Sequence, residues 1–142
     1  MRSIRQGVRA GLVAGVLSGA PSTLHAVVTG GDPLAATVAA GSILLRGETR
    51  RGRLMAAAVP VHFGLSVAWG VVLGALLPPR RTVGYGLLAG AAIAAADLGV
   101  VGRRLPMIRA LPVAPQVLDH LAYGAVAGWL LAGRQAPAAI PG

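Results

Sequence analysis

The sequence predicts an all-α integral membrane protein that folds as a single transmembrane domain over residues 1–142. Its composition is 55% hydrophobic and only 12% charged, and its mean hydropathy is +0.70. A soluble domain of this size needs many more charged residues on its surface. The apolar residues also fall into long runs in which Gly and Ala alternate with Leu and Val, as is typical of transmembrane helices.

Four apolar runs are long enough to cross a hydrocarbon core of about 30 Å, which requires about 20 helical residues. They cover approximately 8–29, 54–77, 82–102 and 112–133. The start of the chain could be a secretory signal, because an apolar stretch follows Arg2, Arg5 and Arg9 and leads to S-G-A at 18–20, a small-residue cleavage site. However, Pro21 would directly follow the cleavage point and apolar residues continue to Val28. We therefore expect a retained span.

A shorter segment, D-P-L-A-A-T-V-A-A-G-S-I-L-L, lies at residues 32–45 between the first two runs. Asp32 suits the N-cap of a helix, and Pro33 suits its first position. A helix over 33–45 would be only about 20 Å long at 1.5 Å per residue. This length predicts a re-entrant or interfacial helix, and a fifth span is the alternative.

The thirteen basic residues are all arginine and occupy the gaps between apolar runs, at 2–9, 46–53, 80–81, 103–109 and 134. This placement is typical of anchors at membrane surfaces and not of a contiguous nucleic-acid-binding face. Four spans would leave six arginines on one side and seven on the other. Five spans would leave ten on the side of the N-terminus and three on the other. The positive-inside rule thus favours five spans with a cytoplasmic N-terminus, whereas segment length favours four.

An internal repeat bears on the number of spans. G-L-V-A-G at 11–15 matches G-L-L-A-G at 86–90, and A-W-G-V-V-L-G-A-L-L at 68–77 matches A-Y-G-A-V-A-G-W-L-L at 122–131. With four spans, both matched pairs keep their direction through the membrane and form two parallel hairpins, 1–78 and 79–134. With five spans, only one pair would be inverted, which a simple duplication does not produce. We therefore predict four long spans and one short helix.

Glycines recur every fourth residue along the predicted spans. Helices in lipid associate through close approach of their backbones at small residues and through interhelical hydrogen bonds. We therefore expect these rows to form the packing faces of the bundle, and we expect the aromatic residues to pack or to anchor the helices at the interface. The rows are Gly7, Gly11, Gly15 and Gly19; Gly70 and Gly74; Gly86 and Gly90; and Gly124 and Gly128.

Five ionisable residues lie within the predicted spans: His25, His62, Asp97, Asp119 and His120. An Asp at the centre of a membrane helix costs about 2.5–3.5 kcal/mol, so such residues usually face the bundle interior or water. Helical periodicity places all of them except Asp119 on glycine-containing faces. With four spans, all five fall roughly 8–13 Å from the same membrane surface. Five spans would put His25 on the opposite side.

Three functions are compatible with this polar layer, defined as the five side chains above. The side chains can simply hydrogen-bond across helices and fix their register, in a structural or partner-binding bundle. They can respond to or conduct protons or a small cation, since His titrates near neutral pH and Asp97 or Asp119 can supply the counter-charge. Finally, His25, His62 and His120 could hold a metal in a membrane enzyme.

The third function has little support in the sequence. There is no Cys and no closely spaced metal motif, and no nucleophile elbow, Walker A loop or dinucleotide fingerprint is present. The sequence therefore predicts no cofactor, and it contains no motif that indicates an enzyme. The partners that it predicts are the lipid bilayer, a second copy of the chain and a proton or small ion, but not nucleic acid.

The pattern D-H-L-A-Y-G-A-V-A-G, preceded by Pro115 and the G-L-L-A-G helix, resembles small uncharacterised bacterial inner-membrane proteins of the YagU-like kind. The resemblance lies mainly within 82–133 and rests on His120, Tyr123, Gly124 and Gly128. It implies a multi-pass protein of the bacterial cytoplasmic membrane and carries no activity. The nearly balanced arginine counts are similar to those of small multidrug transporters, which pair in opposite orientations, but their membrane-embedded Glu is missing here.

Overall fold

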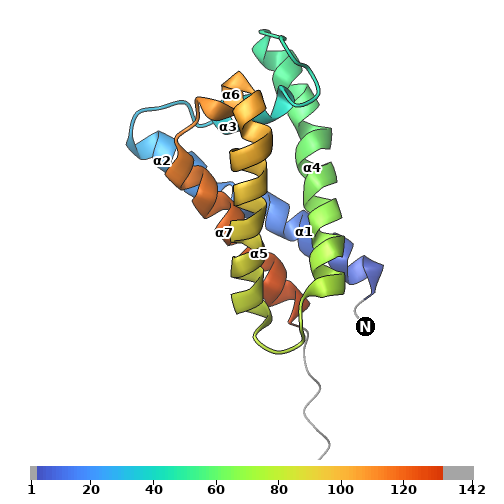
Figure 1. Ribbon diagram of the computed structural model, residues 1–142. Helices are drawn as coiled ribbons and strands as arrows, with labels where there is room; N and C mark the ends of the chain where they lie inside the picture. The colour runs from blue at the N-terminus through green and yellow to red at the C-terminus, as the bar shows by residue number, and fades with distance from the viewer. Residues whose placement is uncertain (1–2, 133–142) are drawn as a thin grey trace, which may run out of the picture.

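The computed structural model describes residues 3–132, and within them the chain is helical throughout, without β-strands (Figure 1). The all-α prediction is confirmed. Three helical stretches in this part of the chain are long and apolar enough to cross a membrane: Ile4–Val28, Arg51–Leu76 and Thr82–Arg104. The fourth predicted span forms helix α7, Val113–Leu131, but the polar side chains of Gln116, Asp119 and His120 lower its hydropathy and it is not among these three.

The first stretch consists of two helices, α1 (Ile4–Ser18) and α2 (Ala20–Val28), which meet at Gly19. Ser3 caps α1 through a reciprocal arrangement with Gln6: its hydroxyl accepts from the Gln6 N–H, and the Gln6 side chain accepts from the Ser3 N–H at 2.8 Å. Gly19 ends α1 and has no side chain with which to cap α2. The predicted continuous helix over 8–29 is therefore broken near its middle.

The short helix predicted at 33–45 is shorter still: α3 covers only Ala35–Gly41. Asp32 is not its N-cap, which is Leu34; the Asp32 carboxylate instead accepts from the Leu34 N–H at 2.9 Å. Turns follow α3 over residues 42–47, and Gly47, with a positive φ of 78°, lies in the last of them before the next long helix. In Figure 1, α3 lies at the same end of the bundle as the short helix α6 (Pro106–Arg109).

The remaining long helices follow the predicted runs, with one departure from regular geometry. Helix α4 covers Arg51–Leu76, and α5 covers Thr82–Ala96. The predicted run 82–102 does not continue as an α-helix, because a π-helical segment, η1 (Asp97–Val101), and a 3₁₀ turn, η2 (Gly102–Arg104), follow α5. The wider π turn begins at Asp97, one of the predicted polar residues.

The first and last long helices form the centre of the bundle. Helix α1 packs against α4 and α7, whereas α5 packs mainly against α7. Helix α2 also packs on α7, and α3 packs on α4. The hydrophobic core gathers small and large side chains from all four long helices: Ala10, Ala14, Leu73, Leu77, Ile93, Tyr123, Ala127 and Leu131.

Glycine rows bring the helix backbones together in both outer pairs. A Cβ on Gly11 would overlap the backbone of Ser66 in α4, and one on Gly70 would overlap the backbone of α1. In the α5–α7 pair, a Cβ on Gly86 or Gly124 would overlap the backbone of the other helix. A Cβ at Gly15 would instead meet the Ser66 side chain, and one at Gly74 would make only an ordinary contact with Gly7. The positions where a Cβ would overlap the backbone of another helix are Gly7, Gly11, Gly70, Gly86, Gly90, Gly124 and Gly128.

Gly19 differs from the other glycines of its row because it contacts no other helix within the described part of the chain. A Cβ at this position would meet no atom within 4 Å. The row of glycines in α1 ends before Gly19 because the helix itself ends there. Its place in the chain marks the break between α1 and α2.

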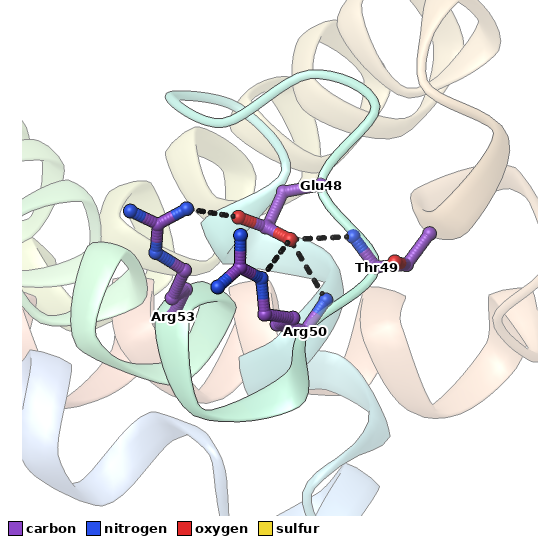
Figure 2. Close-up of polar contacts among 4 residues, drawn as sticks. All are labelled: Glu48, Thr49, Arg50 and Arg53. Carbon is purple, nitrogen blue, oxygen red and sulfur yellow. Dashed lines mark hydrogen bonds and ion pairs between the residues drawn. The ribbon is translucent and has the colours of Figure 1, made fainter.

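The N-terminus of α4 is held by an acidic residue that the sequence analysis did not single out. One Glu48 carboxylate oxygen accepts from the N–H groups of Thr49 and Arg50, each at 3.0 Å, and the other accepts from the Arg53 guanidinium at 2.9 Å (Figure 2). The N–H of Arg50, followed by the Arg53 side chain, lowers the pKa of Glu48. Glu48 therefore fixes the start of α4 where this helix leaves the loop.

A second ion pair joins the loop after α2 to α4 and makes stability depend on acid. Arg51 donates to both carboxylate oxygens of Asp32, at 2.5 and 2.9 Å. The Arg51 side chain, and next the Leu34 N–H, lower the pKa of Asp32 from 3.8 to about 2. Because the folded pKa is the lower one, the stabilisation is present above pH 3.8 and is lost as the pH falls towards about 2.

We expect the thermal midpoint of the protein in detergent to fall as the pH is lowered through this window. The fall should be smaller in Asp32→Asn, which has no carboxylate to protonate there. Circular dichroism melts at about pH 6 and about pH 2 measure both midpoints. Glu48→Gln is the matched variant at the other acidic contact. If the thermal midpoint falls equally in Asp32→Asn and in the parent, the Asp32 carboxylate is not the source of the pH dependence.

Candidate functional site

The closest contact within the predicted polar layer joins η1 to α7. The Nε2 atom of His120 lies 3.4 Å from an oxygen of the Asp97 carboxylate, and its Nδ1 atom lies 2.7 Å from the Gln116 carbonyl oxygen. A carbonyl oxygen only accepts hydrogen bonds, so Nδ1 must carry a proton. The contact between Nε2 and the carboxylate is then a hydrogen bond only when a further proton lies between them. The geometry therefore brings a carboxylate oxygen and an imidazole nitrogen together, and the two can form a hydrogen-bonded ion pair when Nε2 is protonated.

The backbone at Asp97 is irregular. Asp97 opens η1, and its carbonyl oxygen accepts from Gly102, five residues further on. Such π-helical turns occur frequently at functional sites, and they rotate the following residues relative to a regular α-helix. The Asp97–His120 pair thus lies where α5 stops being regular.

Asp119 contacts the first turn of α2, just after the break between α1 and α2. Its carboxylate accepts from the Ser22 N–H at 2.9 Å. Ser22 is the third residue of α2, whose first turn has a free N–H there because Gly19 offers no side-chain cap and Pro21 has no N–H. Helix α7 therefore supplies the cap that α2 lacks. An N–H group without an acceptor costs free energy, which gives a structural reason for an Asp in an apolar helix.

His62 connects α4 to α1. Its Nε2 atom lies 2.9 Å from the Gly15 carbonyl oxygen, so the ring donates a proton to that oxygen. The edge of the ring also faces Phe63, with the two ring centres 5.4 Å apart. His62 and Asp119 are close enough to interact electrostatically, as are Asp119 and His120.

His25 stands apart from the other four residues. Within residues 3–132 its ring has no hydrogen-bonding partner in the protein, and it lines a cavity between α2 and the start of α7. The structure thus joins Asp97 with His120, and it places Asp119 near both His120 and His62. In the described part of the chain, no three His or acidic residues are grouped so that they could hold a metal ion.

Tyr123 is the polar contact that the sequence analysis missed. Its hydroxyl group donates to the Ser66 carbonyl oxygen at 2.5 Å and so connects α7 to α4. The residue is only 8% exposed. A phenol one residue before Gly124, on a helix that also carries Asp119 and His120, was the available indication that the hydroxyl group has a partner.

Tyr123→Phe removes this hydrogen bond and keeps the ring. We expect the free energy of unfolding to fall by about 1 kcal/mol, the usual size of an interhelical hydrogen bond in a membrane bundle. Unfolding by denaturant in detergent measures the change. Tyr85→Phe is the matched control because Tyr85 is 48% exposed, and its substitution should have no comparable effect.

The chain was compared with models of protein families, with curated proteins and with solved structures. No match was found in any of the three. The resemblance to YagU-like proteins therefore stays a prediction, and the site rests on its own geometry.

Proposed function

We propose that this chain is a multi-pass membrane protein with four spans, formed by α1 with α2, α4, α5 with η1 and η2, and α7. Figure 1 supports this topology: α3 and α6 lie at one end of the bundle, whereas the loop between α4 and α5 and the end of α7 lie at the other. A protein with these spans belongs in the bacterial cytoplasmic membrane.

Cysteine labelling of intact cells tests the topology, because the chain has no cysteine of its own. Thr49→Cys in the loop before α4 and Arg80→Cys in the loop before α5 should react from opposite sides of the membrane. Reaction of both only from the same side would overturn the four-span topology. Reaction of each from both sides would support insertion in two orientations and pairing of copies, which the nearly equal arginine counts favour.

Within this bundle, we infer that the Asp97–His120 pair binds one proton and that the protein responds to pH. The observation that carries this function is the double contact of His120, with a carbonyl oxygen at one ring nitrogen and a carboxylate at the other. Loss of the shared proton would leave an anionic oxygen facing a nitrogen lone pair. That repulsion would loosen η1 from α7.

The surroundings of the pair support a response more than transmembrane conduction. The other titratable groups nearby are Asp119 on α7 and His62 on α4. Towards the opposite end, the core between the long helices is formed by apolar side chains, including Ala10, Ala127 and Leu131. Among residues 3–132, this apolar half offers no chain of polar side chains along which a proton could move.

Nuclear magnetic resonance of ¹⁵N-labelled histidine tests the function. We expect the Nδ1 atom of His120 to stay protonated while Nε2 gains or loses a proton as the pH is changed, with simultaneous changes in the amide resonances of 97–104. Asp97→Asn should weaken proton binding at His120, because an amide does not offset the imidazolium charge. His25→Asn is the matched control. If the 97–104 resonances do not change with the His120 titration, the proposal is wrong.

A further inference from the structure

A cavity of about 160 Å³ lies between α2, α3 and the start of α7. It begins at the exposed Asp32 and reaches Ser22, the residue whose N–H is bound by Asp119. On α2, Ser22, His25 and Thr29 line it, and their spacing of three and four residues places them on one helix face. The cavity therefore runs along α2 from the end of the bundle to the Asp119 contact.

The residues of α7 that line the cavity also lie next to the Asp119 contact. Pro115 and Gln116 line the cavity, and Asp119 and His120 follow each of them by four residues, one helical turn deeper. The Gln116 carbonyl oxygen is also the partner of His120 Nδ1. The floor of the cavity is thus formed by the residues that position the proton site.

Small and apolar residues form most of the cavity lining, and the few polar groups among them, together with the size of the cavity, favour water and small hydrophilic ions as its occupants. The His25 ring and the Gln116 amide both face it half-buried, and neither bonds a protein group within residues 3–132. Unpaired polar groups in a membrane bundle are costly unless water reaches them. At about 30 Å³ per water, the volume holds about five molecules. It is far too small for a lipid.

We propose that this cavity is an aqueous vestibule through which protons reach Asp119 and the Asp97–His120 pair from the end of the bundle that carries α3 and α6. The inference rests on the proposed function for the destination of the protons. The vestibule adds the side from which protons enter and their route along α2. It also gives His25 a role, as a polar group that lines the route outside the Asp97–His120 pair.

Cysteine reactivity tests whether the cavity holds water, because methanethiosulfonates react with the thiolate, which forms only where water is present. Ala26→Cys and Ala36→Cys introduce thiols into its two walls. We expect both to react with a positively charged methanethiosulfonate added from the α3 side, within about tenfold of the rate at the exposed loop variant Thr49→Cys.

Two control variants set the background rate. Leu88→Cys lies on an outer face of α5 that is 67% exposed in the isolated chain and would face lipid, and Ala127→Cys lies in the core at 0% exposure. Rates at the cavity positions no faster than at Leu88→Cys would overturn the vestibule. Ala35→Cys, on the same α3 wall, replaces any variant whose circular dichroism shows that it does not fold.

A second measurement tests the route and separates it from the proposed function. Once Ala26→Cys has reacted, the bulky adduct should slow exchange of the His120 ring proton with water at least tenfold. Unchanged exchange would overturn the route even if the cavity is wet. Failure of the His120 titration itself, in the unmodified parent, would instead overturn the proposed function, whereas the cysteine rates would still report on the vestibule.

Discussion

Alanine in place of Gly124 is expected to lower the free energy of unfolding by about 1–3 kcal/mol, the usual cost of overpacking. A Cβ at Gly124 would overlap the carbonyl group of Gly86 and lie 3.0 Å from the Gly90 nitrogen. These neighbours are backbone atoms and have no alternative rotamer. The helices α5 and α7 would therefore have to separate, and they share the most extensive contact in the bundle.

The matched control is Gly84→Ala on α5, where a Cβ would meet no atom within 4 Å. Here the substitution should be neutral or stabilising by up to about 1 kcal/mol, because alanine is the better helix former. Denaturant titrations in detergent, followed by circular dichroism, compare both variants with the parent. Similar destabilisation by the two substitutions would show that the predicted contact between backbones is not what matters.

Removal of the Asp119 carboxylate is expected to have the second large effect. Asp119→Ala removes the hydrogen bond from the half-buried Ser22 N–H to a carboxylate, and a hydrogen bond to a charged group contributes about 1.5–3 kcal/mol. Asp119→Asn keeps an oxygen that can accept from Ser22, so most of the stability should remain. Hydrogen exchange at the amides of α2 measures the effect locally, and faster exchange should be confined to Asp119→Ala.

The comparison of these two variants separates the cap from the charge of Asp119. If Asp119→Asn destabilises α2 as much as Asp119→Ala, the negative charge is what holds the helix. If neither variant changes exchange at α2, Asp119 does not cap this helix. Ser22→Ala serves as a further reference because it keeps the N–H and removes only the hydroxyl group.

Hydropathy was sufficient to place the long helices within a few residues of their observed ends, because a membrane helix needs a long apolar run whatever it packs against. It could not find the break at Gly19. Glycine is common in continuous membrane helices, and only the tertiary contact of Asp119 with Ser22 makes a helix start at Ala20 stable. The π-helical turn at Asp97 has no sequence motif either.

The separation of His25 from the other polar residues follows from that break. Counting by threes and fours from Gly11 to His25 assumes one continuous helix, whereas α1 ends at Ser18 and α2 begins at Ala20. On α7, which is continuous, the same counting correctly sends Asp119 and His120 to different neighbours. Their partners could not be named from the sequence, since the relative position of the helices depends on side chains more than 90 residues apart.

The contact between α1 and α7 has a consequence for biosynthesis. Ala10 and Ala14 from the start of the chain share a core with Tyr123 and Ala127 from its end. During translation, α1 can pair with α4, but the face of α1 that packs on α7 has no partner until the final helix has left the ribosome. The centre of the bundle therefore forms last. Any chain that stops before α7 leaves Ala10 and Ala14 of its first helix without the side chains that pack on them.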